Sequence, residues 1–284
     1  MTKATWWQYL LPQQWLTRCA GALAQCRWAW LKNRLIRAFI RYFGVNMAEA
    51  QIEDYRQYPC FNDFFIRALK PSARPLKIDD KHVLSPVDGV ISACGAIEND
   101  QLFQAKGHVF SLCALLGSDD EHARSFERGA FMTAYLSPKD YHRFHFPVAA
   151  KLVAMRHIPG RLFSVNATSV ADIPGLFAKN ERVVCFFETD FGPFALVAVG
   201  AMIVGSIATE WHGTVNTPRQ RVISDWRYEG APQYFKQGDL LGHFKLGSTV
   251  IMLFPENAIA FEQSVSAGAL LQLGQTLATV LDLS

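Results

Sequence analysis

The first 47 residues contain no aspartate or glutamate. They hold seven of the protein's 28 lysines and arginines, and five of its seven tryptophans. The rest of the chain is mildly acidic, so the net charge of +3 comes from this segment. A basic, tryptophan-rich segment is typical of helices that lie in a membrane interface. The basic residues of this segment are Lys3, Arg18, Arg27, Lys32, Arg34, Arg37 and Arg41, and its tryptophans are Trp6, Trp7, Trp15, Trp28 and Trp30.

The same segment lacks an uninterrupted run of 18 apolar residues, so we expect no spanning helix. It also lacks a basic n-region followed by a clean apolar h-region, so we expect no cleaved signal peptide. Its basic and apolar residues recur instead at helical spacing on different faces, and Gly44 is placed to end the helix. We therefore predict amphipathic helices on a membrane surface; the alternative is that they pack on the body of the protein. The apolar face comprises Trp28, Leu31, Leu35, Phe39 and Tyr42.

Several familiar site patterns are also missing. The six cysteines form no C-x-x-C pair, which indicates reduced thiols in a cytoplasmic compartment rather than a disulfide framework or a zinc site. Neither a G-x-G-x-x-G nor a G-x-x-x-x-G-K-[ST] loop is present. Nucleic-acid binding has little support, because the basic residues are concentrated in the amphipathic helices.

Beyond residue 76, short alternating apolar runs are separated by glycine and proline, as in "HVLSPVDGVISACGAI", "GAFMTAYL" and "STVIMLF". Such runs predict many short strands. The fold class we expect is α+β: a β-rich, sandwich- or barrel-like body preceded by amphipathic N-terminal helices. Two segments of the body are expected to be helical, Gln104–Gly117 and residues 137–145 ("SPKDYHRFH").

The stretch "FKLGSTVIMLF" places Gly247 and Ser248 directly before an apolar run. One interpretation is an ordinary turn between strands. In the other, the Ser248 hydroxyl attacks the carbonyl of Gly247, whose small size allows the strained geometry. Elimination from the resulting ester would cut the chain and leave a pyruvoyl group. That group is an electrophilic carbonyl that can hold an amine substrate covalently and accept electrons from a breaking bond.

Such an attack needs a base. His142 and His145 are three residues apart in "YHRFHFP", on one face of the expected helix, and imidazole both takes and gives protons near neutral pH. Asp88 lies in "SPVDGV", where it could equally be an ordinary turn residue. The two histidines could likewise have only a structural role. A metal site needs more ligands than this pair, so none is expected.

Together these stretches resemble the phosphatidylserine decarboxylase family, of the bacterial and mitochondrial L-G-S-T type. The chain contains "FNDFFIRALKPSARP", "SPVDGV", "YLSPKDYHRFHFP", "GRLFSVN", "NERVV", "VGAMIVGSI" and "FKLGSTVIMLF" in the family's order. The resemblance covers nearly the whole chain from about residue 50. The N-terminal helices are similar to the family's membrane-associating region.

The resemblance implies roles for individual residues. Gly247-Ser248 matches the self-cleavage bond, and Ser248 matches the residue that becomes the pyruvoyl cofactor. Asp88 and His145 match the residues that form a processing triad with that serine, and His142 matches a histidine implicated in decarboxylation. The implied domains are membrane-associating helices over 1–48 and a catalytic domain over 49–284. Cleavage would give a β subunit of 1–247 and an α subunit of 248–284.

The implied reaction converts phosphatidylserine to phosphatidylethanolamine. Its implied setting is the cytoplasmic face of the cell (inner) membrane, with the protein peripherally bound as a homodimer of cleaved αβ protomers. Two alternatives remain open: a pyruvoyl enzyme acting on a soluble amino acid, and an uncut carrier module related to lipoyl or sugar-phosphotransfer carriers, whose turns "SPVDGVI" also resembles.

Overall fold

The computed structural model describes residues 5–118, 121–202, 206–215, 222–228, 230, 233–245 and 248–281. Its α-helices are α1 (Gln13–Ala24), α2 (Ala29–Phe43), α3 (Phe61–Phe65), α4 (Leu112–Leu116), α5 (Glu121–Arg124), α6 (Ala167–Asp172) and α7 (Leu176–Lys179). Short 3₁₀ turns are η1 (Trp6–Tyr9), η2 (Met47–Glu49), η3 (Tyr55–Gln57) and η4 (Pro71–Ala73).

The strands are β1 (His82–Leu84), β2 (Gly89–Ala96), β3 (Gln101–Ala105), β4 (His108–Ser111), β5 (Ala130–Leu136), β6 (Arg143–His145), β7 (Ala150–Ile158), β8 (Arg182–Thr189), β9 (Gly192–Val199), β10 (Ile207–Thr209), β11 (Gly213–Val215), β12 (Ser224–Arg227), β13 (Gln233–Phe235), β14 (Leu240–Phe244), β15 (Ser248–Phe254), β16 (Ile259–Phe261), β17 (Leu270–Leu271) and β18 (Thr276–Val280). The strands predicted in the body are therefore confirmed.

A nine-stranded sheet organises the body. Its order is β12-β7-β8-β9-β15-β5-β2-β17, and β13 also pairs with β7. Strand β15 lies between β9 and β5 and is antiparallel to both. This strand reads as a nearly continuous apolar run because both of its faces are buried: Val250 and Met252 enter one core, Ile251 and Leu253 the other.

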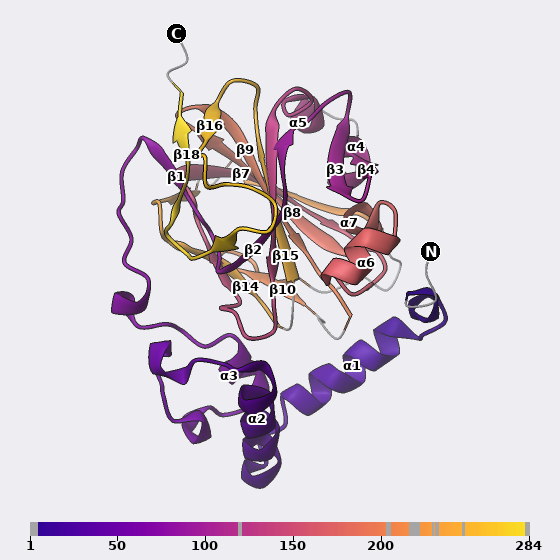
Figure 1. The fold of residues 1–284 in the computed structure, drawn as a ribbon, viewed down its shortest axis with the longest axis vertical. Helices are drawn as coiled ribbons and strands as arrows, with labels where there is room; N and C mark the ends of the chain where they lie inside the picture. Colours follow the sequence, from indigo (N-terminus) through magenta and orange to yellow (C-terminus); the bar gives the residue numbers. More distant parts are fainter. Residues whose placement is uncertain are drawn as a thin grey trace.

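The two cores lie on opposite faces of this sheet (Figure 1). One face is covered by the β3–β4 hairpin with α4, α6 and α7. The other is covered by two smaller sheets, of order β1-β18-β16 and β11-β10-β14-β6. This layered arrangement of sheets, with helices preceding it, confirms the predicted α+β class and its sandwich-like body.

The N-terminal helices are present as predicted. Helix α2 ends at Gly44, which adopts a left-handed conformation (φ 70°) and bonds back to Ile40. Ile36 and its neighbours on α2 pack in a small core of their own with Phe64 and Tyr58. Among the described residues, no helix is long and apolar enough to cross a membrane.

The N-terminal segment also contacts the body. The Gln8 amide donates to Ser169 Oγ (3.0 Å) and accepts from Ser164 N (2.9 Å), while Gln13 accepts from Leu162 N (2.9 Å). Helix α1 leads from this contact to α2 and α3 (Figure 1). Part of the N-terminal segment is therefore bonded to the body, as expected if these helices pack on the body of the protein. The division into domains 1–48 and 49–284 stays a prediction.

The helix expected over Gln104–Gly117 is wrong in its first half. Strands β3 and β4 form a hairpin there, and its turn residues Lys106 and Gly107 both have positive φ (48° and 78°), as a tight two-residue hairpin turn requires. Helix α4 begins only after Ser111, whose hydroxyl caps it.

The helix expected over residues 137–145 is wrong as well. The Asp140 carboxylate accepts bonds from both N and Oγ of Ser137, each at 2.7 Å, which closes a tight turn instead of starting a helix. The chain then enters strand β6, which pairs with β14. His142 and His145 therefore share no helical face, because residues three apart along an extended chain point to opposite sides.

Candidate active site

Three strand ends meet at one end of the large sheet. Ser248 begins β15 and pairs with Leu136, the last residue of β5. Strand β2 begins beside it at Gly89, where a Cβ atom would lie 2.3 Å from the carbonyl oxygen of Tyr135. Because β2 and β15 both run antiparallel to β5, which lies between them, Asp88 and Ser248 lie at the same end of the sheet. Gly247 lies outside the described residues, and Ser248 is described only through its backbone.

The histidine segment is bonded to the same region. The backbone N–H of His145 donates to the Pro86 carbonyl (2.9 Å), two residues before Asp88. The His142 carbonyl accepts from Phe244 N (2.9 Å), the last residue of β14, four positions before Ser248. The fold thus brings together the three segments that the sequence singled out.

His145 has a defined hydrogen-bond pattern. Its Nδ1 lies 2.9 Å from the Gly238 carbonyl and therefore carries the proton, so Nε2 accepts from the Tyr141 hydroxyl at 3.2 Å. Burial lowers the pKa of His145 below its usual value and raises the pKa of Tyr141 to about 12. At neutral pH the imidazole is neutral, and its unprotonated Nε2 can take a proton once the Tyr141 hydroxyl gives way.

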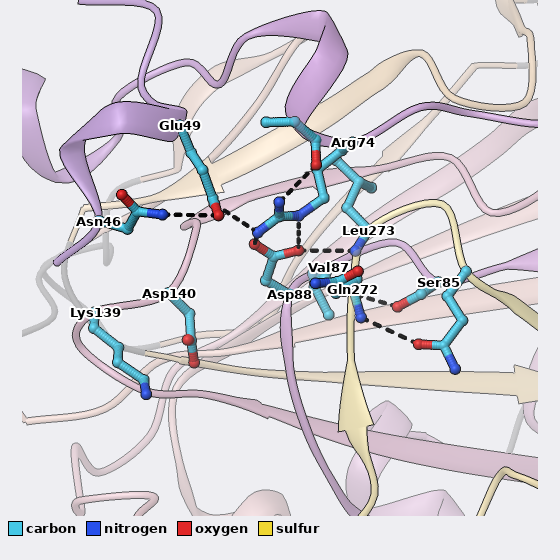
Figure 2. A network of polar contacts seen from close by, with 12 residues as sticks. Asn46, Glu49, Arg74, Ser85, Val87, Asp88, Lys139, Asp140, Gln272 and Leu273 are labelled. Atoms are coloured by element: carbon cyan, nitrogen blue, oxygen red, sulfur yellow. Dashed lines mark hydrogen bonds and ion pairs between the residues drawn. The ribbon is translucent and has the colours of Figure 1, made fainter. Parts of the chain in front are cut away.

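Asp88 is held by an arginine instead of by His145. Arg74 donates from Nε to Oδ1 (2.8 Å) and from Nη2 to Oδ2 (2.7 Å), and Leu273 N donates to Oδ1 (2.8 Å). Arg74 Nη2 also bonds to Glu49 (2.9 Å), which accepts in turn from Asn46 (Figure 2). Hydrogen bonding to Asp88 is the main cause that raises the pKa of Arg74.

The predicted triad residues are therefore neighbours in the fold, but their side chains are not linked. Within the described part of the chain, no hydrogen bond joins Asp88 to His145: their polar atoms bind Arg74, Gly238 and Tyr141 instead. Sequence reasoning missed Arg74 as a partner of Asp88. Its only signal was its place in "FNDFFIRALKPSARP".

His142 is fully buried. Its Nδ1 lies 2.8 Å from the Asp140 carbonyl, and its ring lies against Phe65, with centroids 4.0 Å apart. Its Nε2 is buried and has no hydrogen-bond partner among the described residues. Burial, with a smaller contribution from the nearby charge of Arg67, lowers the pKa of His142 to about 3. Nε2 is therefore an unprotonated, unpaired acceptor inside the protein.

A metal centre has no support in the described part of the chain, which contains no group of three or more histidine, cysteine, aspartate or glutamate side chains placed to hold an ion. All six cysteines are free. The chemistry available here is that of a serine at a strand start, a buried and a partly buried neutral histidine, and a carboxylate held by an arginine.

Comparison with known proteins identifies the family. A family model described as phosphatidylserine decarboxylase matches residues 61–279, and a second, described as PSD, matches residues 4–44. The chain belongs to the phosphatidylserine decarboxylase family. Two similar relatives, both named phosphatidylserine decarboxylase proenzyme, come from Acidovorax ebreus (53% identical over 271 residues, 95% of each chain) and Nitrosospira multiformis (53% over 279 residues, 97% of this chain and 96% of the relative).

A third relative with the same name, from Dechloromonas aromatica, is 51% identical over 270 residues, 95% of each chain. These matches include the basic N-terminal segment as well as the body. The family resemblance inferred from the ordered motifs is thus confirmed over nearly the full length of the chain.

Proposed function

We propose that this protein decarboxylates phosphatidylserine to phosphatidylethanolamine, using a pyruvoyl group made by self-cleavage between Gly247 and Ser248. Family membership supports the reaction. The main support for the site is the pairing of Ser248 with Leu136, at the sheet end to which the segments of Asp88, His142 and His145 are also bonded. Cleavage would give a β subunit of 1–247 and an α subunit of 248–284.

The residues at this sheet end fit a pyruvoyl group derived from Ser248. When present, the group supplies an electrophilic carbonyl that holds the substrate amine and accepts the electron pair of the Cα–carboxylate bond. Strand β15 holds its attachment point between β5 and β9. The neighbouring His142 contributes a buried Nε2 with no partner in the described residues, as expected of a group reserved for chemistry.

In self-cleavage, we assign His145 as the base that takes the hydroxyl proton of Ser248. Its neutral form, with Nδ1–H fixed on the Gly238 carbonyl, suits that role. The proposed third member of the triad is Asp88. It acts as a negative charge near the imidazole while bound to Arg74, or it hydrogen-bonds to His145 after Arg74 has moved away. Either route keeps the triad of Asp88, His145 and Ser248.

In decarboxylation, we assign His142 as the proton donor to the substrate carbon. Because Nδ1 is committed to the Asp140 carbonyl, the proton must be carried on Nε2, which has to take it up before giving it. His142→Ala should leave self-cleavage intact and impair decarboxylation. A fully active His142→Ala protein would refute this division of roles.

The protein is proposed to act as a peripheral membrane protein on the cytoplasmic face of the cell (inner) membrane, as a homodimer of cleaved protomers. Support for membrane contact comes from the N-terminal segment, where four tryptophan side chains are more than half exposed despite their size. These are Trp6, Trp15, Trp28 and Trp30.

The deciding experiment is the intact mass of the purified protein under denaturing conditions, followed by an assay on phosphatidylserine vesicles and on free serine. We expect two fragments, separated between Gly247 and Ser248, the smaller with a pyruvoyl terminus, and activity on the vesicles alone. The Ser248→Ala chain should stay whole. A single unbroken wild-type chain would refute the proposal, and turnover of free serine alone would favour a pyruvoyl enzyme for soluble amino acids.

A further inference from the structure

Arg67, just beyond helix α3, is a buried cation whose hydrogen-bonding capacity is largely unused. Its side chain is 3% exposed. Nη2 donates to the Lys139 carbonyl (2.8 Å) and approaches the Asp140 carbonyl (3.5 Å). Nε and Nη1 are buried and have no partner among the described residues, and the described ion pairs include none with Arg67. Such a group is costly unless something pairs with it.

The unused donors lie beside the proposed catalytic histidine. Arg67 Nη2 and His142 Nδ1 approach the same acceptor, the Asp140 carbonyl, at 3.5 Å and 2.8 Å. His142 also has an unpaired buried atom, Nε2. Two buried groups without partners among the described residues therefore lie in the same small region: the N–H donors of Arg67 and the acceptor Nε2 of His142. The His142 carbonyl in turn binds Phe244, close to the proposed cleavage bond.

Holding the loop at Lys139 and Asp140 in place would use only one of the three guanidinium nitrogens of Arg67. Only Nη2 bonds to that loop, and the guanidinium carbon lies 5.5 Å from the centre of the Phe64 ring, a contact that involves no hydrogen bond. A contrast is Arg182, equally buried at 2% exposure, whose Nε, Nη1 and Nη2 each donate to backbone carbonyls. All three nitrogens of the Arg182 guanidinium have partners, whereas Nε and Nη1 of Arg67 have none among the described residues.

Unpaired N–H groups of a guanidinium bind oxyanions through charge-assisted hydrogen bonds. The proposed substrate carries two oxyanions, a carboxylate and a phosphodiester. The carboxylate loses its charge as CO₂ forms, so a strong pair there would stabilise the substrate more than the transition state and slow the reaction. The phosphodiester keeps its charge throughout.

We propose that Arg67 binds the phosphodiester of the lipid headgroup and so sets the position of the serine moiety next to His142. This inference rests on the proposed function and adds to it a recognition residue for the phosphate. Because substrate and transition state carry the same phosphodiester, Arg67 contributes to binding of both, and its loss should act on KM more than on kcat.

The test replaces Arg67 with lysine, which keeps the charge and a donor for the Lys139 carbonyl but removes the unpaired Nε and Nη1 donors. For a dispersed short-chain phosphatidylserine, we expect the KM of the Arg67→Lys protein to rise roughly 10- to 100-fold, the usual effect of losing a charge-assisted pair, with kcat changed by less than about threefold. The matched control Arg182→Lys should lower thermal stability without this rise in KM.

A binding measurement covers the case in which Arg67→Lys fails to self-cleave. Titration calorimetry on full-length Ser248→Ala chains, with and without Arg67→Lys, would use sn-glycero-3-phosphoethanolamine, which has a phosphodiester and no carboxylate, and free serine, which has the reverse. We expect the first probe to bind only when Arg67 is present. The proposal would be overturned if both chains bound that probe equally, if neither bound it, or if replacing Arg67 abolished only the binding of serine.

These readouts separate the inference from the function on which it rests. A wild-type protein that decarboxylates phosphatidylserine, combined with an unchanged KM in Arg67→Lys, would overturn the role of Arg67 alone. A wild-type protein without decarboxylase activity would refute the proposed function, while the calorimetry would still report on the phosphate site.

Discussion

Both carboxylate oxygens of Asp88 are bound by one guanidinium, that of Arg74, at 2.8 Å and 2.7 Å. The pair is largely buried, with 9% of the Asp88 side chain and 13% of the Arg74 side chain exposed. A third bond, from Leu273 N, fixes the carboxylate further. Arg74 is therefore a positioning residue for the aspartate that we place in the processing triad.

Replacing Arg74 with methionine should destabilise the fold and slow self-cleavage. The substitution leaves a buried carboxylate without its counter-charge, which costs about 3 kcal/mol of unfolding free energy. The measurements are urea unfolding in the uncleaved Ser248→Ala background and the time course of fragment formation by mass in the Ser248 chain. Glu49→Gln is the control: its carboxylate is 36% exposed, so we expect a loss below about 1 kcal/mol. Equal stability of the Arg74→Met and parent chains would contradict the assignment.

Gly89→Ala adds only one methyl group, yet it should slow self-cleavage. The new methyl would lie 2.3 Å from the Tyr135 carbonyl oxygen, so β2 would have to move away from the end of β5, where Ser248 pairs. Gly44→Ala is the matched control, because Gly44 also has positive φ (70°) but has open space around it. We expect Gly44→Ala to cost about 1 kcal/mol and to cleave at the wild-type rate, and Gly89→Ala to cleave slowly. Equal cleavage rates would be evidence against a site at this sheet end.

Stability should fall on acidification, in part through His142. Burial lowers its pKa from 6.5 to about 3, so between these values the unfolded chain binds a proton that the folded chain does not. The contribution of neutral His142 to the free energy of unfolding is present in full above pH 6.5 and is lost as the pH falls toward 3. One such group contributes a loss of about 2 kcal/mol between pH 7 and pH 5. Burial also lowers the pKa of His243, to about 4, and adds in the same direction.

The check compares urea unfolding at pH 7 and pH 5 for the Ser248→Ala chain with and without His142→Asn. Asparagine retains an N–H that can donate to the Asp140 carbonyl but cannot titrate. We expect the variant to lose about 2 kcal/mol less than its parent over this range. An identical pH dependence would show that His142 is not buried in its neutral form.

Binding to anionic vesicles should depend on the exposed tryptophans of the N-terminal segment. Trp28 and Trp30 are 68% and 61% exposed, and the guanidinium of Arg34 lies over the Trp30 ring at 5.7 Å. We expect Trp28→Ala combined with Trp30→Ala to weaken partitioning roughly tenfold and to leave self-cleavage unchanged, measured by vesicle sedimentation at low and high salt. Tyr234→Ala, which removes a 73% exposed aromatic from the body, is the control. A result in which both variants sediment like wild type would contradict a role for these tryptophans.

Much of the molecule follows from local patterns. Short apolar runs predicted strands such as β5 and β15, and the helical spacing of α2 with Gly44 behind it predicted that helix and its end. Local patterns failed where short polar segments had two possible partners. Residues 137–145 resemble a capped helix, yet the Asp140 carboxylate binds Ser137 and β6 pairs with a strand about 100 residues later in the chain.

By itself the sequence determined the family, the candidate residues Asp88, His142, His145 and Ser248, and the amphipathic character of the N-terminus, because each is encoded within a few consecutive positions. Only the tertiary structure decided what these residues contact. The bond from Leu273 to Asp88 joins positions 185 residues apart, and no local spacing encodes such a contact. The same holds for the unpaired donors of Arg67, because whether a buried donor has a partner depends on every segment that packs around it.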